Sequence, residues 1–439
     1  MEVRDPIHGA IAVSPAEIPI LDHPFVQRLR HIKQMGFSAL PFPGAVHSRY
    51  LHSVGIMHLA GRAFDAAFRG HDFSSPQVRT SYRECVRLAA LLHDVGHAPF
   101  SHCSEFAMPP LSELGIGVYH PEVYSRRGDR RASHEDYTVG IINHSSLTAT
   151  IEAWFPFAAR HVSALVSREV LVEDDFFLDG GLDYRRVLSQ LISSELDVDR
   201  LDYLVRDSYF SGVRYGMVDV NWLVNNLSLH VVEDRVSLAL DRRAIYAFDD
   251  FIIARYHMFV MVYFHHKSVA FEEMLKRYIN GPRCTFRIPA SMEEYLYCDD
   301  VFLHAHLRQQ DDPWARDIVN RQAWRRVLEL HGTPEEVDIS RAVERLEVAG
   351  IDHFSAGSVG KLSRYTVFGQ KRETAPPIYV IDNLPGSHRP AQDLSTATAI
   401  FERYQDERRI ARLYVHPSKV DQAHDVLGVA PLPDQLSLL

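Results

Sequence analysis

One segment, ECVRLAALLHDVGH at residues 84–97, constrains the fold of this chain more than any other. It is apolar on nearly every side through Leu92, so we expect a central buried helix, which Pro99 ends. His93 and Asp94 lie inside this expected helix, where both polar side chains lose water and need partners. A divalent metal provides them, because imidazole nitrogen and carboxylate oxygen are both good metal ligands. A hydrogen-bonded core histidine is the alternative interpretation.

Other histidines extend this pattern. His97 follows one helical turn later on the same face, and His102 comes after the helix-ending proline. His52 lies near the start of a second helix, predicted over residues 48–68, and its apolar neighbours indicate partial burial. His47 falls just ahead of that helix, where we expect it to be exposed. An HDxxH pattern accompanied by further candidate ligands favours a metal site over isolated core histidines.

An acidic pattern recurs in the run ELDVDRLDYLVRD, within a helix predicted over residues 184–207. Asp199, Tyr203 and Asp207 recur there at i, i+4 and i+8, so they share one helical face, with Arg206 beside it. Asp199 is a candidate metal ligand on this face. A solvated charged stripe is the alternative, and the spacing alone does not decide between the two.

The remaining patterns predict a mainly α fold with a smaller α+β lobe. We expect residues 1–280 to form the helical core and residues 281–439 to form a C-terminal α+β lobe packed on it. The further predicted elements are a long aromatic-rich helix at 249–278, a loop able to move at 115–132, a hairpin at 229–240 that turns at Glu233 and Asp234, amphipathic helices near 290–330, and β-like runs at 365–368, 378–381 and 410–415.

Composition excludes several classes of protein. The 439 residues are 46% hydrophobic and 24% charged, which are ordinary globular values and rule out wholesale disorder. A formal net charge of −10 argues against strong nonspecific nucleic-acid binding. The four cysteines lack CxxC spacing and are expected to be reduced thiols. With no secretory signal and no apolar run of about 18 residues, we expect a cytoplasmic protein without a membrane partner.

Six motifs carry a resemblance to a known family. Together with His52, His93-Asp94 and Asp199, in that order, they resemble the HD-domain deoxynucleoside triphosphate triphosphohydrolases, a group of dGTPase-like and SAM- and HD-domain restriction-factor-like enzymes. No SAM domain is present, and the resemblance runs from about residue 3 to residue 280. The motifs are DPIHGAIAVSP from Asp5, QRLRHIKQMG from Gln27, FPGAVHSRYLHSVG from Phe42, LLHDVGHAPFSH from Leu91, SHED from Ser133 and LDVDRLDYLVRDSYFSG from Leu196.

The resemblance implies an HD-domain helical core with one divalent metal, held by His52, His93, Asp94 and Asp199. Mn, Fe, Co, Ni or Mg all suit such a site, with additional Mg on the triphosphate. A metal with an open coordination position lowers the pKa of bound water and neutralises phosphate charge. In the implied reaction, metal-bound water attacks the α-phosphorus and yields deoxynucleoside and tripolyphosphate.

The resemblance also places histidines along the triphosphate. His97, His102 and His134 would line the phosphate channel, since a histidine with a near-neutral pKa can protonate a leaving oxygen. His134 is the implied general acid, with His102 and Glu105 close by. Taken alone, a histidine in a polar loop such as His134 would be interpreted as a surface residue.

Substrate contacts of three kinds follow from the same resemblance: phosphate clamps, sugar contacts and aromatic walls. A tyrosine packed against C2′ leaves no room for a ribose hydroxyl, while amide and carboxylate groups bind the 3′-hydroxyl. The aromatic walls are alternatively core side chains of a long helix. The residues are Arg49, Arg200 and Arg206 for the phosphates, Gln34, Tyr203 and Asp207 for the sugar, and Tyr263 and Phe264 for the walls.

An activator site and an assembly are implied as well. Asp22, Gln27 and Arg30 match residues of an activating nucleotide site, which suggests GTP or a dNTP as activator in a homo-oligomer, a dimer or tetramer; helix-surface charges are the alternative. Two other functions stay open: an HD-domain nucleotidase or phosphodiesterase acting on another nucleotide phosphoester, and a non-catalytic nucleotide-binding regulator. The sugar contacts argue against the first, and the intact ligand set with His134 argues against the second.

Overall fold

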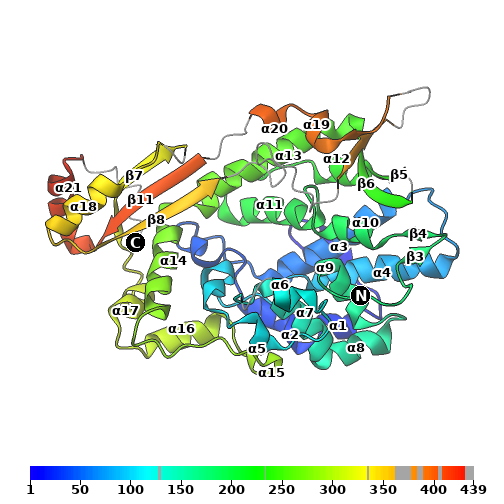
Figure 1. The fold of residues 1–439 in the computed structure, drawn as a ribbon, viewed down its shortest axis with the longest axis horizontal. Helices are drawn as coiled ribbons and strands as arrows, with labels where there is room; N and C mark the ends of the chain where they lie inside the picture. Colours follow the sequence, from blue (N-terminus) through cyan, green and yellow to red (C-terminus); the bar gives the residue numbers. More distant parts are fainter. Residues whose placement is uncertain are drawn as a thin grey trace.

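The fold is that of a computed structural model, which describes residues 1–126, 130–232, 234–333, 336–360, 377–382, 389–403 and 408–430. Its architecture is mainly α, as the sequence predicted. One large hydrophobic cluster unites most of the helices, and a second, smaller cluster lies at one end of the molecule (Figure 1). The elements of the smaller cluster are β7 (Arg325–Gly332), α18 (Ser340–Val348), β11 (Arg408–Val415) and α21 (Val420–Leu427).

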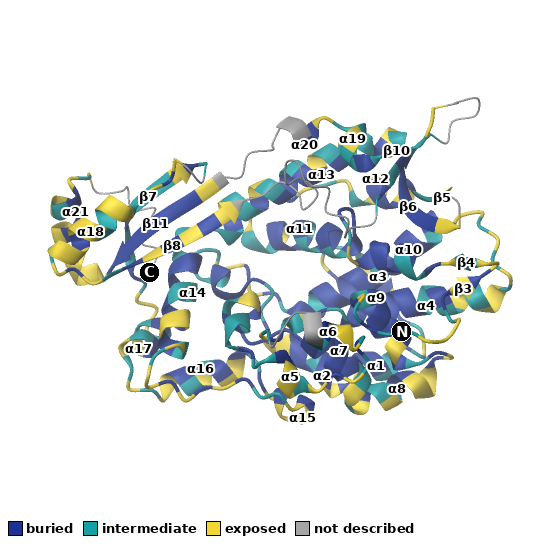
Figure 2. Ribbon diagram, in the orientation of Figure 1, coloured by how far each residue is buried: buried dark blue, intermediate teal, exposed yellow. Residues whose placement is uncertain are grey.

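Two helices form the centre of the large cluster. α3 (Arg49–Ala67) begins directly after Ser48, as predicted, and packs against α4 (Pro76–Leu92). Figure 2 shows α3 as a buried helix, in contrast to the largely exposed α18. Burial on most sides of α3 explains why polar side chains on it, such as His52, need defined partners.

The end of the second helix differs from the prediction. α4 ends just before His93, so Asp94 lies in the turn that follows rather than inside the helix. The cause is the packing of α7 (His134–His144) against this turn. The Thr138 hydroxyl donates to the His93 carbonyl at 2.9 Å and accepts from the Gly96 N–H at 3.0 Å, which satisfies backbone groups that the helix leaves free. A Cβ at Gly96 would collide with α7, so glycine permits this approach.

The predicted helix over residues 184–207 is two helices, which corrects that expectation. They are α10 (Arg185–Ile192) and α11 (Val198–Ser211). Asp197 lies between them as the N-cap of α11, and its carboxylate accepts from the Arg200 N–H at 2.8 Å. An N-cap of this kind starts a new helix because it satisfies a free backbone donor in the first turn.

The long aromatic helix predicted over residues 249–278 is also interrupted. α13 (Ile245–Met258) passes into a π-helical turn (Phe259–Tyr263), and α14 (His266–Ile279) starts afresh. His265 caps α14 by accepting from a backbone N–H through its side chain. Such π-helical turns occur frequently at functional sites.

Short hairpins flank the helices. β1 (Glu2–Asp5) and β2 (Gly9–Ala12) form an antiparallel hairpin at the N-terminus. The predicted hairpin is confirmed as β5 (Leu227–Val232) and β6 (Arg235–Asp241), which pair antiparallel. Glu233, at its predicted turn, lies outside the described residues.

The C-terminal strands join two different sheets. β9 (Tyr379–Ile381) pairs in parallel with β6 and so ties the C-terminal part to the helical core. β11 lies between β7 and β8 (His353–Gly360) in an antiparallel sheet. The runs 378–381 and 410–415 therefore contain strands, whereas 365–368 lies outside the described residues. The domain boundary at residue 280 stays a prediction.

Other expectations concern the segments between these elements. The predicted amphipathic helices ahead of β7 are present, and the described residues of the segment 115–132 include one short helix, α6 (Glu122–Arg126). All four cysteines are free. Across the described part of the chain, none of the helices combines the length and the apolar character needed to span a bilayer. The helices ahead of β7 are α15 (Met292–Tyr295), α16 (Asp300–Arg308) and α17 (Pro313–Val319).

Candidate metal centre and cavity

Four side chains from three elements meet at one point. His52 comes from α3, His93 and Asp94 from the end of α4 and the following turn, and Asp199 from the first turn of α11. His52 Nε2 lies 3.0 Å from Asp199 Oδ1, and His93 Nε2 lies 3.1 Å from Asp94 Oδ1. The distances from His93 Nε2 to Asp199 Oδ1 and from His52 Nε2 to Asp94 Oδ2 are 3.6 and 3.7 Å. The fold thus brings together all four predicted ligands.

These donors fit a divalent cation. The Nε2 atoms of His52 and His93 are buried and make no well-aligned hydrogen bond to the described residues. Nδ1 of His93 is held by the Ala90 carbonyl at 2.9 Å, and the two imidazole planes meet at 68°, which lets their lone pairs converge. Burial lowers the pKa of His52, but the carboxylates of Asp199 and Asp202 raise it to about 10, so the pocket strongly attracts positive charge. Two nitrogens and two carboxylates suit several divalent metals.

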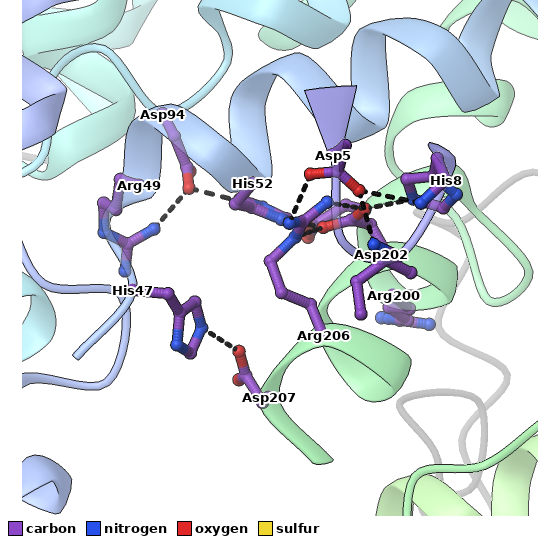
Figure 3. A network of polar contacts seen from close by, with 12 residues as sticks. Asp5, His8, His47, Arg49, His52, Asp94, Arg200, Asp202, Arg206 and Asp207 are labelled. Carbon is purple, nitrogen blue, oxygen red and sulfur yellow. Dashed lines mark hydrogen bonds and ion pairs between the residues drawn. The ribbon is translucent and has the colours of Figure 1, made fainter. Parts of the chain in front are cut away.

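A buried network holds His52 from its other side (Figure 3). His52 Nδ1 lies 2.8 Å from Asp202 Oδ2, and Asp202 Oδ1 lies 2.6 Å from His8 Nε2. Arg206 donates to both oxygens of Asp202, at 2.7 and 2.9 Å, and to Asp5 Oδ2 at 2.7 Å. The Arg206 side chain is 0% exposed and does not border the cavity described below. Arg206, predicted as a phosphate clamp, is instead the ion-pair partner of two buried carboxylates.

A second group of histidines lies beside the first. Nitrogens of His97, His102 and His134 come within 4.8 Å of one another, as in a metal site. The rings of His97 and His134, however, are stacked, with centroids 4.0 Å apart and planes 13° from parallel. Because the lone pair of imidazole lies in the ring plane, two nearly parallel rings cannot direct their lone pairs at one ion between them. This geometry suits contacts with substrate better than a second metal.

Glu105 organises this second group. It accepts hydrogen bonds from His134 Nδ1 at 2.8 Å and from the His134 backbone N–H at 3.0 Å, and it lies 3.0 Å from His102 Nδ1. Burial lowers the pKa of His134, but the hydrogen bond to Glu105 and its charge outweigh burial and raise it above the ordinary value. Burial and the charge of Arg49 hold the pKa of His97 well below its usual range. His134 is therefore better suited than His97 to carry a proton near neutral pH.

A cavity of about 640 Å³ runs past both groups. Its wall includes Asp94, His93 and Asp199 of the metal centre and the three histidines of the second group. It also includes every predicted substrate residue except Arg206, namely Gln34, Arg49, Arg200, Tyr203, Asp207, Tyr263 and Phe264.

The predicted sugar contacts are held in place by the surrounding structure. Asp207 Oδ1 lies 2.8 Å from His47 Nε2, and Asp207 Oδ2 accepts from the Tyr263 hydroxyl at 2.7 Å. His47 was expected to be exposed, but it is buried and stacks on Phe210 with ring centroids 4.5 Å apart. The Oε1 atom of Gln34 is buried without a hydrogen bond to the described residues, so it remains available as an acceptor.

The two predicted phosphate clamps that line the cavity, Arg49 and Arg200, have acidic partners. Arg49 donates to Ser101 Oγ at 2.8 Å and pairs with Asp94. Arg200 donates to the Glu195 carbonyl at 3.0 Å and lies 3.4 Å from the Glu195 carboxylate. These contacts fix the guanidinium groups at the cavity wall, where they bring positive charge toward a bound anion.

The predicted activator residues lie elsewhere, at the surface of the N-terminal helices. Asp22 and Arg30 are exposed, and Gln27 is half-buried. Gln27 donates to the Leu21 carbonyl at 2.6 Å and accepts from Arg30 at 2.7 Å, while the Arg30 guanidinium lies over the ring of Tyr50. These contacts make one surface cluster, and its activator role stays a prediction.

Sequence reasoning missed residues of two kinds. Asp202 and His8 stand behind the metal centre; the i, i+4 spacing of Asp202 and Arg206 was the available signal for the first. The far wall of the cavity comes from Glu272 on α14 and from residues 356–359 of β8. Burial raises the pKa of Glu272 to about 7. No local pattern marks these wall residues, because only the folded chain brings β8 to the cavity.

Two family models match the sequence. One is described as the HD domain and matches residues 49–206; the other is described as an HD associated region and matches residues 218–347. The uncharacterized protein YwfO of Bacillus subtilis is 27% identical over 443 residues, covering 94% of this chain and 91% of YwfO. Human SAMHD1, a deoxynucleoside triphosphate triphosphohydrolase, is 32% identical over 227 residues, covering 48% of this chain. A SAMHD1 homolog of Dictyostelium discoideum is 29% identical over 275 residues.

The extent of these matches differs. This chain spans 33% of the length of human SAMHD1 and 48% of the Dictyostelium homolog. Among solved structures, a hypothetical protein from Aquifex aeolicus superposes with a TM-score of 0.73 at 24% identity, covering 97% of this chain and 99% of that one. A phosphohydrolase from Bacteroides thetaiotaomicron gives 0.65 at 22% identity, covering 94% and 99%. At such identities the likeness to the two solved structures concerns the fold alone.

Proposed function

We propose that this chain, which matches the HD domain and the HD associated region, hydrolyses deoxynucleoside triphosphates to deoxynucleoside and tripolyphosphate. The observation that carries the proposal is a single cavity bordered by three of the four candidate metal ligands, the second histidine group and the predicted sugar contacts. Its volume of about 640 Å³ lies within the range of ordinary small-molecule sites. The human and Dictyostelium relatives are named deoxynucleoside triphosphate triphosphohydrolases, which supports the same reaction.

The phosphate end of the cavity supplies charge and a proton. When bound at His52, His93, Asp94 and Asp199, a divalent cation supplies a Lewis acid for phosphate oxygen and water. As the oxygen of water bonds to the α-phosphorus, the bond from phosphorus to the 5′-oxygen breaks; one proton of the water stays on the new P–OH group of tripolyphosphate and the other is released to solvent. His134 donates a proton from Nε2 to that leaving oxygen, because its Nδ1 is engaged by Glu105.

The remaining cavity residues orient the substrate. Arg49 and Arg200, fixed by their acidic partners, balance charge on the triphosphate. Tyr203 and Tyr263 stand edge to face at 6.3 Å and close the space beside the sugar. Asp207 is preorganised by two hydrogen bonds, so it can meet the 3′-hydroxyl without reordering. Rejection of a ribose 2′-hydroxyl would rest on the Tyr203 ring, which the family resemblance places against C2′.

The activator, the assembly and the identity of the metal belong to the proposal. GTP or a dNTP would bind near Asp22, Gln27 and Arg30 in a homo-oligomer, and Mn, Fe, Co, Ni or Mg would occupy the centre. The charge of −10 leaves strong nonspecific nucleic-acid binding disfavoured. The alternative phosphoester hydrolase keeps the same metal centre, and only the sugar contacts separate it from the main proposal.

Product analysis tests the reaction. Metal-loaded protein is incubated with each dNTP and each NTP, alone and with GTP or a second dNTP, and the phosphate products are resolved by ion exchange. Tripolyphosphate formed from dNTPs but not from NTPs is the expected result. Orthophosphate or pyrophosphate would overturn attack at the α-phosphorus. Silence with every nucleotide and every metal would instead favour the regulator.

A further inference from the structure

The candidate metal centre is supported by residues far from it in sequence. β1 and the turn after it bring Asp5 and His8 against α11, 194 residues downstream, where His8 meets Asp202. Figure 3 shows His8 and Asp5 on one side of Asp202 and Arg206, with His52 on the other. Exposure of the side chains is 6% for His8 and 0% for both Asp202 and His52, so water competes little for these contacts.

Donor and acceptor roles follow from this arrangement. Arg206 carries only donors and gives two of them to Asp202, which fixes Asp202 as an acceptor-only carboxylate. The nitrogen of His52 that faces Asp202 must then carry the hydrogen. A histidine that binds a metal is neutral and has one N–H, so in the metal-bound protein the lone pair of His52 lies on Nε2, on the side of Asp94 and Asp199.

A glycine on α3 makes room for the same carboxylate. A Cβ at Gly55 would collide with the side chains of Asp202 and Arg206. Glycine within a helix costs about 1 kcal/mol relative to alanine, and here it lets the carboxylate approach the helix that carries His52. Two positions on α3 therefore accommodate Asp202: Gly55 leaves space for its carboxylate, and His52 contacts that carboxylate through Nδ1.

We infer that Asp202 and His8 are positioning residues of the metal centre: Asp202 fixes the tautomer and ring orientation of His52, and His8 fixes Asp202. Carboxylates behind a metal-bound histidine typically change metal affinity by about 10- to 100-fold. The N-terminal hairpin is consequently part of the metal centre, although it contributes no ligand. The inference rests on the proposed metal centre and not on the identity of the substrate.

Metal binding to the full chain, stripped of metal by chelation, tests the inference. Titration calorimetry with Mn²⁺ gives a dissociation constant for the unaltered protein and for Asp202→Asn, His8→Ala and His8→Gln. We expect Asp202→Asn to weaken Mn²⁺ binding about 10- to 100-fold and His8→Ala about 10-fold. His8→Gln should recover much of the loss, because a glutamine amide can donate to Asp202 from a similar position.

A matched control separates positioning from general loss of packing. The ring centroids of His58 and His8 are 5.7 Å apart, but among the described residues His58 forms no hydrogen bond or ion pair with Asp202. His58→Gln should therefore bind Mn²⁺ as the unaltered protein does. Nitrogen-15 NMR of histidine in the Mg²⁺-loaded protein supplies a second readout: the hydrogen of His52 should lie on Nδ1 in the unaltered protein and should redistribute in Asp202→Asn.

Each result of the Mn²⁺-binding measurements either supports or overturns the inference about Asp202 and His8. Equal Mn²⁺ affinity in Asp202→Asn, His8→Ala and the unaltered protein overturns the inference, as does equal weakening in His58→Gln. If Asp202→Asn fails to fold because Arg206 loses a partner, the two His8 variants still decide. A protein that binds Mn²⁺ with the expected sensitivities but hydrolyses no dNTP would contradict the proposed function and leave this inference standing. A protein that binds none of Mn, Fe, Co, Ni or Mg would overturn the inference.

Discussion

Two groups of histidines lie beside the same cavity, which His93, His97, His102 and His134 border, and the orientation of their rings separates the two groups. In the first group, the His52 and His93 rings meet at 68° and each Nδ1 is held from behind, so both Nε2 atoms face Asp94 and Asp199. In the second group, His97 and His134 are stacked at 13°. The same residue type thus offers converging lone pairs in one place and parallel ring faces in the other.

The carboxylates that contact the two histidine groups also differ in their positions. Asp94 and Asp199 stand among the nitrogens of the first group, where they add to the negative charge that a cation neutralises. Glu105 stands behind the second group and holds a proton on His134. A carboxylate stands behind an imidazole in both groups, Asp202 behind His52 and Glu105 behind His134, so the carboxylates in front of the first group are what favour a cation there.

Removing Asp199 tests the first group and carries the largest expected effect. Asp199→Ala deletes one of four candidate ligands and should abolish metal binding and hydrolysis together. The rate should fall by at least about 10³-fold, since a metal contributes several kcal/mol of charge stabilisation. Metal content after dialysis and kcat/KM for a dNTP are measured on the same preparation. Full activity in this variant would remove Asp199 from the site.

A structural feature of the two histidine groups could be predicted from the sequence where the residues that cause it are close together in the chain. The four candidate ligands were predictable because the HD pair, His52 and Asp199 lie in distinctive patterns. The end of α4 was not, because its cause is Thr138 on another helix.

The role of Arg206 was hidden for the same physical reason. Its chemistry suits a phosphate clamp, but its partner Asp5 is 201 residues away in sequence. The mainly helical class was predictable from periodicity, whereas the breaks after α10 and α13 depend on caps such as Asp197 that look like ordinary helix residues in sequence.

His134→Gln tests the second histidine group. The variant should keep its metal content and lose about 10²- to 10⁴-fold in kcat, because it removes the proton donor without touching the first group. Metal titration and single-turnover rates separate the two effects. Loss of metal comparable to that in Asp199→Ala would mean that the second group also binds an ion, and the distinction drawn from ring stacking would fail.

Glu105→Gln carries the smallest expected effect and concerns pH. The pKa of His134 is lowered by burial but raised overall by Glu105, and a general acid works only while protonated. The rate should therefore fall as pH rises through the pKa of His134. A hydrogen bond to a charged group contributes about 1.5–3 kcal/mol, so loss of the Glu105 charge should move this fall about one to two pH units lower. The pH profile of kcat/KM at saturating metal measures the shift, and metal affinity should not change. An unmoved alkaline limb would show that the proton comes from a group other than His134.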